Sequence, residues 1–153
     1  MYFEQLVKLK AEAPAWRLLL ADHGPLIISF LDTTFLQPGK RFIPQSLLAS
    51  LLSKFLNDIH QEYPDLHFPK TPKEYLDEWS HDDKGWLRRF YPTEADEVHY
   101  DLTAESQRAC TWINQLMDKT FIGTQSRLAL IASLIQINHP RKPRRSTRKN
   151  HNA

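Results

Sequence analysis

Two short segments rich in aromatic and branched residues interrupt a sequence whose other apolar residues follow a helical pattern. The segments are WLRRFY, residues 86–91, and EVHYDL, residues 97–102, and the polar link PTEAD joins them. A link of this length favours an antiparallel hairpin between two predicted strands. Because a two-stranded hairpin is marginally stable in water, it must pack on other elements. The sequence therefore predicts a helical core that the hairpin covers with Trp86, Phe90, Val98 and Tyr100.

The apolar residues outside the hairpin recur at three- to four-residue spacing, which is typical of amphipathic helices. The longest such segment, residues 44–63, places seven apolar residues on one stripe: Leu47, Leu48, Leu51, Leu52, Phe55, Leu56 and Ile59. Thr71 and Glu74 form a capping box at the start of a shorter helix, whose first position is Pro72. We predict helices over residues 2–13, 14–24, 25–36, 44–63, 72–82, 104–120 and 124–137.

The order of the central elements predicts the fold. A helix, a turn with a short strand at residues 41–43, a long helix, a short helix and a hairpin follow one another between residues 25 and 102. We therefore predict a mainly α fold, with a winged-helix domain (helix-turn-helix plus β-hairpin wing) and flanking helices, over residues 1–137. A chain of 153 residues fits one such domain. Residues 138–153 lack apolar side chains almost entirely, which predicts a disordered tail.

The net charge of +2 conceals an uneven distribution. Residues 139–153 hold six of the 20 lysines and arginines and none of the 18 acidic residues. Residues 1–138 therefore hold 14 basic and 18 acidic residues, a net charge of −4. A mildly acidic body argues against nucleic-acid binding through its surface.

The predicted helix 72–82 bears directly on the DNA question, because the third helix of a DNA-reading winged helix enters the major groove. This helix and its C-terminal end carry Lys73 and five carboxylates, which would repel phosphates. The carboxylates belong to Glu74, Asp77, Glu78, Asp82 and Asp83. We therefore favour a surface that binds protein.

Two sets of candidate site residues follow from these alternatives. For protein association we select five apolar residues that serve as core or interface anchors, roles that the sequence does not separate: Tyr75, Leu76, Trp79, Trp86 and Phe90. The alternative is a winged-helix DNA-binding regulator whose contacts come from the wing and the tail. Its candidate residues are Lys84, Arg88, Arg89, Arg141, Lys142, Arg144 and Arg145.

The sequence offers no convincing catalytic or metal-binding motif. The seven histidines are scattered, and a single cysteine gives no support to a zinc site. Cys110 shares a helical face with Ile113 and Met117, which favours packing over nucleophilic chemistry. The polar residues His81, Asp82 and Asp83 lie at the C-terminal end of a predicted helix, where polar residues are common. We expect no enzyme activity, no cofactor and no metal.

The N-terminus does not have the pattern of a signal peptide, and no apolar run reaches the roughly 20 residues of a membrane span. One cysteine is compatible with a reducing compartment. We therefore expect a cytoplasmic protein that does not contact membranes.

Several blocks of the sequence resemble one bacterial family. They are PAWRLLLADHGPLIISFL (14–31), PKTPKEYLDEW (69–79), DKGWLRRFYP (83–92), HYDLT (99–103) and FIGTQSRL (121–128). In this order and spacing they resemble the N-terminal part of the JetA family, long described as a domain of unknown function. JetA proteins are kleisin-type, MukF-like subunits of the Wadjet (JetABCD) systems. The resemblance covers nearly all of residues 1–137.

The resemblance implies a function that the composition does not. Kleisin-type subunits link the heads of an SMC-type ATPase and recruit small accessory subunits, and the assembly restricts plasmid DNA. In MukF-like kleisins the N-terminal winged-helix region serves in dimerisation. The expected partners are therefore a second copy of the chain, the SMC-type ATPase and accessory subunits, with DNA contacted indirectly. Family members are several hundred residues long, so we expect a fragment or a truncated product of a longer chain.

Overall fold

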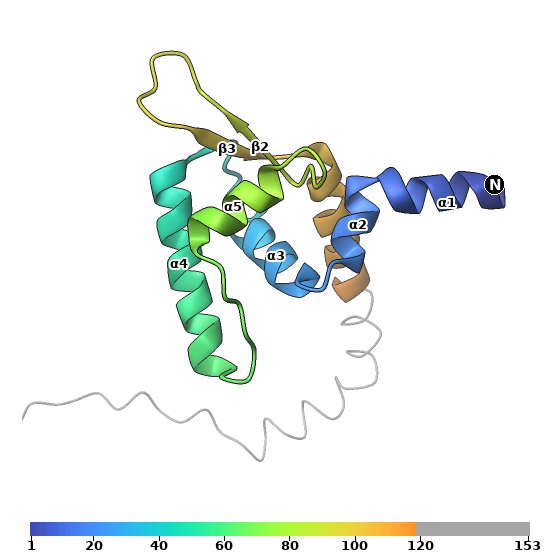
Figure 1. The fold of residues 1–153 in the computed structure, drawn as a ribbon, viewed down its shortest axis with the longest axis horizontal. Helices are drawn as coiled ribbons and strands as arrows, with labels where there is room; N and C mark the ends of the chain where they lie inside the picture. The colour runs from blue at the N-terminus through green and yellow to red at the C-terminus, as the bar shows by residue number, and fades with distance from the viewer. Residues whose placement is uncertain (119–153) are drawn as a thin grey trace, which may run out of the picture. The chain divides into compact units, whose positions relative to one another are not determined.

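A computed structural model describes residues 1–118 of the chain. Residues Met1–Asn114 form one compact unit, and a second unit begins at Gln115. The chain is mainly helical, with a small sheet (Figure 1). The helices are α1 (Phe3–Glu12), α2 (Pro14–Leu20), α3 (Gly24–Leu31), the π-helical turn η1 (Asp32–Leu36), α4 (Gln45–Glu62) and α5 (Pro72–Ser80), and a further helix covers residues 104–118. The strands are β1 (Ile43–Pro44), β2 (Leu87–Phe90) and β3 (His99–Leu102).

Prolines and caps begin several helices where the sequence predicts. Pro14, Pro25 and Pro72 lie in the first turns of α2, α3 and α5, where the missing N–H has no helical partner to lose. At α5 the Glu74 N–H donates to Thr71 Oγ1 and the Thr71 N–H donates to Glu74 Oε2, both at 3.2 Å. The predicted capping box is therefore confirmed.

The helix predicted over residues 25–36 is not a single α-helix. It changes to π-helical geometry at Asp32, where the Gln37 N–H donates to the Asp32 carbonyl at 3.0 Å. The Asp32 carboxylate also accepts hydrogen bonds from the side-chain amides of Gln37 and Asn114, each at 2.8 Å. One of these partners is near Asp32 in the sequence and the other is far from it, and the periodicity of apolar residues predicts neither contact.

The hairpin forms as predicted, and β1 adds a third strand to it. β2 and β3 are antiparallel, with Leu87 opposite Leu102 and Phe90 opposite His99. β1 pairs with the other edge of β3, so the sheet order is β1-β3-β2. The short strand predicted at residues 41–43 is found at Ile43–Pro44, so it shares only Ile43 with the prediction.

The core forms where α2, α3, α4, α5 and the sheet meet (Figure 1). Trp86, Val98 and Tyr100 are buried in it, as the sequence predicts. Phe90 is only half-buried, so its predicted part in the core is wrong. Side chains alternate along a strand, so Phe90 shares a face with exposed Arg88, whereas Leu87 points inward and is buried. The Phe90 ring instead meets Phe42 at a centroid distance of 5.9 Å.

The helix over residues 104–118 is tied to the start of the hairpin. Thr103 caps it by accepting the Ser106 N–H at 3.2 Å, and the Thr103 hydroxyl donates to the Gly85 carbonyl at 2.8 Å. The buried Ser106 hydroxyl donates to the Trp86 carbonyl at 2.7 Å. Cys110 is buried in the core, as expected from its position on the helix.

Helix α1 differs from the other α-helices of the described part, because none of its residues is buried. Figure 1 shows it leading away from the helices that surround the core. Its sequence is nevertheless amphipathic: Tyr2, Phe3, Leu6, Val7 and Leu9 fall on one side, and we call these residues the α1 stripe. Within the described chain this stripe has no core to face.

Candidate interaction site

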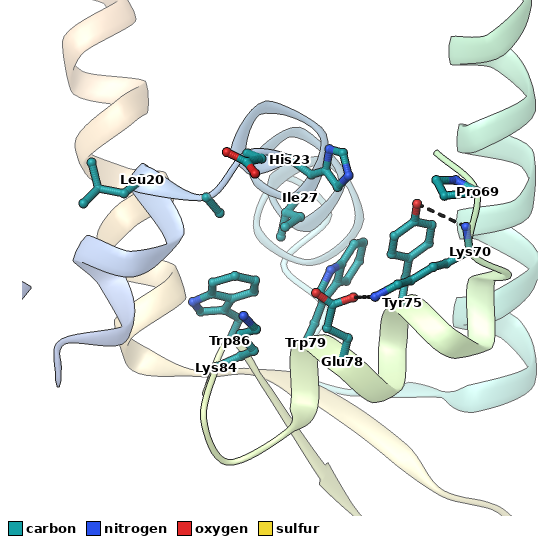
Figure 2. Close-up of a pocket in the computed structure, with 12 residues that line it drawn as sticks. Leu20, His23, Ile27, Pro69, Lys70, Tyr75, Glu78, Trp79, Lys84 and Trp86 are labelled. Carbon is teal, nitrogen blue, oxygen red and sulfur yellow. Dashed lines mark hydrogen bonds and ion pairs between the residues drawn. The ribbon is translucent and has the colours of Figure 1, made fainter. Parts of the chain in front are cut away.

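A cleft of about 450 Å³ opens between the turn that joins α2 to α3 and the C-terminal half of α5. Its volume lies in the range of small-molecule and side-chain pockets. Figure 2 shows side chains from three parts of the chain surrounding it. The residues that line it, which we call the aromatic cleft, are Leu20, Ala21, Asp22, His23, Ile27, Pro69, Lys70, Tyr75, Glu78, Trp79, Lys84 and Trp86.

The floor of the aromatic cleft is apolar and firmly held. Trp79 and Trp86 are 1% and 3% exposed, and the Trp86 indole Nε1–H donates to the Pro14 carbonyl at 3.0 Å. The Tyr75 ring stacks on Trp79 with centroids 5.7 Å apart, and the Tyr75 hydroxyl accepts the Lys70 N–H at 3.4 Å. These rings are almost fully covered by the chain itself, so they form the buried inner wall of the cleft and leave little apolar surface open.

Charged groups surround this floor. Lys70, in the segment before α5, forms an ion pair with Glu78 of that helix, and the hydrogen bond to Glu78 raises the pKa of Lys70. The Lys84 ammonium lies 5.5 Å from the centroid of the Trp86 ring and has no direct ion pair within residues 1–118. Asp22, in the turn that joins α2 to α3, is exposed and likewise has no cationic partner in that range. The rim therefore offers one unpaired anion and one unpaired cation.

The exposed apolar surface of the described chain includes the α1 stripe and the rim of the cleft. Phe3 is 81% exposed and Tyr2 75%, and Val7 and Leu9 are each about half exposed. Leu20, at the rim of the aromatic cleft, is 57% exposed. Large exposed aromatic side chains on one helix face are typical of surfaces that bind protein.

The wing arginines are already paired with carboxylates of the same chain. Arg88 holds Asp101 through three contacts, from Nε at 3.0 and 3.2 Å and from Nη2 at 2.8 Å. Arg89 Nη1 lies 3.4 Å from Asp77 Oδ1, which belongs to α5. These carboxylates partly neutralise the charge that each arginine would offer to a phosphate.

The described residues hold no group of three or more histidine, cysteine, aspartate or glutamate side chains that could bind a metal ion. His81 and Asp83 form an exposed pair at 2.8 Å, and this hydrogen bond is the main cause that lowers the pKa of Asp83. Burial raises the pKa of the Cys110 thiol to about 11, which keeps it protonated and unreactive at neutral pH. Every helix in residues 1–118 is too short or too polar to cross a lipid bilayer.

The structure separates the predicted anchor residues into groups. Tyr75, Leu76, Trp79 and Trp86 are all buried, and all but Leu76 form part of the cleft, whereas Phe90 lies apart from it. Lys84 borders the cleft, and Arg88 and Arg89 belong to the wing. Four predicted nucleic-acid contacts, Arg141, Lys142, Arg144 and Arg145, lie outside the described residues, as do the predicted helix 124–137 and the basic tail.

Sequence reasoning did not select Asp22 or Leu20, which complete the cleft, or the α1 stripe as a surface. The apolar residues of α1 recur at helical spacing, but the same spacing is typical of a helix that packs on its own core. The pattern therefore does not show that this face is exposed. Asp22 and Leu20 approach Trp86 only through the fold, so nothing in their local sequence marks them.

Comparisons with known proteins place the chain in a family. The family described as "Protein of unknown function (DUF3375)" matches residues 8–141. An uncharacterized protein of Mycolicibacterium smegmatis (strain ATCC 700084 / mc(2)155) is 36% identical over 140 residues. The alignment covers 91% of this chain but only 29% of that relative, so the chain spans less than a third of its length. No solved structure matches the chain. The chain thus belongs to the DUF3375 family of proteins of unknown function.

Proposed function

We propose that the chain is a non-enzymatic protein-association domain that forms a homodimer. The proposal places it in a kleisin-like subunit of a Wadjet, SMC-type plasmid-defence complex of the cytoplasm. The sequence blocks that resemble the JetA family support the second part. The exposed α1 stripe supports the first part independently of that resemblance.

The fold assigned to the central elements is a winged helix. In this assignment α3, α4 and α5 are its three helices, and β2 and β3 are the wing. The order of elements from α3 to β3 supports it, as does the pairing of β1 with β3 on the side away from β2. α5 would then be the helix that reads DNA in other winged helices, and it carries Glu74 in its first turn and Asp77 and Glu78 further along.

The observation that carries the dimer proposal is the lack of a buried residue in α1. An isolated helix of ten residues is marginal in water, because its hydrogen bonds do not offset the cost of nucleation. Most helices in proteins are stabilised by burying an apolar face. A second copy supplies such a contact without any further component.

The remaining partners come from the resemblance alone. An SMC-type ATPase and accessory subunits would bind segments that a chain of this length does not include, since the chain covers 29% of its mycobacterial relative. DNA would be reached through the complex and not through the wing. The carboxylates that hold Arg88 and Arg89 support this indirect role over the DNA-binding regulator.

Sedimentation equilibrium of the full 153-residue chain tests the dimer. A monomer has a mass of 18.0 kDa. The proposal predicts a concentration-dependent rise towards twice this mass at micromolar concentrations. A mass of 18.0 kDa across the whole concentration range would refute the homodimer.

A further inference from the structure

We propose that the solvent-facing side of the three-stranded sheet is part of the dimer interface, and that it packs on the same face of a second copy. The inference rests on the proposed homodimer and names a surface that forms it. α1 has ten residues, whereas a stable interface takes about 20–30 residues from each partner. The α1 stripe alone is therefore too small, and a dimer needs a further surface on the body of the chain.

The strand register shows which side chains this face carries. Leu87 and Tyr100 are buried in the core, so their neighbours along the two strands point to the opposite side of the sheet. We call these neighbours, with the residue just before β1, the outer sheet face: Phe42, Arg88, Phe90, His99 and Asp101.

Three aromatic rings meet at the centre of the outer sheet face. The centroid of the Phe42 ring lies 5.9 Å from that of Phe90 and 5.7 Å from that of His99. Phe42 is 49% exposed and the other two rings are partly exposed, so the cluster presents open aromatic surface. The solvent side of an antiparallel sheet commonly carries polar residues. An exposed ring cluster at this place therefore indicates a contact with another molecule.

The charged pair beside the rings adds no net charge. The Arg88 guanidinium lies 4.6 Å from the centroid of the Phe90 ring, and its Nη2 donates to Asp101 at 2.8 Å. The positive charge next to the ring is thus balanced within the chain. The centre of the outer sheet face is aromatic and close to neutral, so two identical centres can approach without repulsion.

The two ends of the sheet carry opposite charges. β1 is antiparallel to β3, so Lys40 and Arg41, which precede β1, lie towards the end of the sheet where β3 finishes. Glu94 and Asp96 belong to the loop that joins β2 to β3, which extends beyond the opposite end (Figure 1). All four residues are exposed, and none has an ion pair within residues 1–118.

This distribution of charge favours a second copy as the partner. A two-fold axis that lies between two outer sheet faces and runs across the strands reverses the strand direction of one copy relative to the other. The basic end of each copy then meets the acidic end of the other, and the rings pack on the rings between them. A two-fold contact of this kind uses one self-complementary patch and closes without adding further copies. Aromatic pairs stabilise such a contact beyond the area that they bury.

Charge reversal at each end of the full chain tests the inference. Lys40→Glu with Arg41→Glu reverses the basic end, and Glu94→Lys with Asp96→Lys reverses the acidic end. Each variant places like charges together in both pairings of the dimer. At about tenfold per pairing, the dimer Kd measured by sedimentation equilibrium rises roughly 100-fold. Matched controls reverse exposed charges on α4, on α5 and between them, and leave Kd within about twofold: Lys54→Glu with Lys73→Glu, and Asp58→Lys with Asp65→Lys.

Combining the two changes gives the decisive result. A chain with all four substitutions at the sheet ends exchanges their signs, so opposite charges meet again and Kd returns to within about tenfold of wild type. An equal mixture of the two single-end variants also associates more tightly than either alone, because a copy with two acidic ends meets a copy with two basic ends. A general loss of folding cannot produce this recovery.

A further variant tests the aromatic centre. Phe42→Ala raises Kd about tenfold, whereas Tyr63→Ala, which removes a ring that is 52% exposed after α4, leaves it within about twofold. Aromatic rings on a sheet can also stack on bases, and a fluorescein-labelled oligothymidine is the probe for this use. Binding of the probe that Phe42→Ala weakens, in a chain whose Kd does not respond to the charge reversals, assigns the face to single-stranded nucleic acid and overturns the inference.

The remaining outcomes separate the inference from the proposed function. A wild-type dimer whose Kd responds to none of the variants places the interface elsewhere, which overturns the inference and leaves the homodimer standing. Weaker association in both single-end variants, without recovery in the combined variant or the mixture, shows that the two ends do not face each other and also overturns it. A wild-type chain that stays monomeric refutes the homodimer, and the inference with it.

Discussion

Replacing Arg88 and Arg89 by alanine separates the two uses considered for the hairpin. If both guanidinium groups contact phosphates, their removal lowers the slope of log K against log salt for duplex DNA by roughly 2, about 0.9 for each contact. In the structure Arg88 is held by Asp101 through three contacts of 2.8 to 3.2 Å, and Arg89 lies 3.4 Å from Asp77. We therefore predict a change in slope below about 0.5.

The assay is a salt titration of duplex binding by fluorescence anisotropy with the full chain. Lys40→Ala with Arg41→Ala is the matched control, because it removes two exposed cations that have no ion pair within residues 1–118. The stability cost of Arg88→Ala is small, since the Arg88 side chain is largely exposed to solvent. A fall in slope of roughly 2 for the Arg88 and Arg89 variant, but not for the control, would refute the reasoning and favour the DNA-binding regulator.

Two further predictions concern the fold. The pKa of Cys110 rises from 9.0 to about 11 on folding, so the unfolded chain ionises first and stability falls between pH 9 and pH 11, by up to about 2–3 kcal/mol. In urea denaturation, the free energy of unfolding should therefore fall more steeply with pH over this range for wild type than for Cys110→Ala. An equal pH dependence in the two chains would contradict the burial argument. Thr71→Ala removes the side-chain cap of α5 and should lower the free energy of unfolding by about 1 kcal/mol in urea denaturation, whereas Thr93→Ala in the hairpin loop should change it little. A Thr71→Ala chain as stable as wild type would show that the cap contributes nothing.

Local sequence signals were sufficient to predict several elements. The capping box at Thr71, the prolines at helix starts and the hairpin around residues 92–96 each depend on a few neighbouring residues, and the structure contains all three. The long apolar stripe of α4 likewise gives a long helix, with Leu48, Leu52 and Leu56 buried. These features depend on contacts within one element or between sequence neighbours.

Other features depend on contacts between distant parts of the chain. Leu87, and not Phe90, takes the buried position on β2, because pairing with β3 decides which face of the strand points inward and the local sequence does not show it. The π-helical turn at Asp32 is held in part by Asn114, which lies 82 residues away in the sequence. The aromatic cleft combines Asp22, Tyr75 and Trp86 from three separate segments. Sequence identified its aromatic residues but not the space between them.

Amide hydrogen exchange of α1 tests the central claim, that this helix is stabilised by a second copy. The account predicts that the amides of Phe3–Glu12 are protected in concentrated solutions of the full chain and lose protection on dilution, while those of α4 remain protected throughout. Exchange of the α1 amides at the rate of an unfolded peptide at every concentration would contradict it, and so would protection that does not change on dilution.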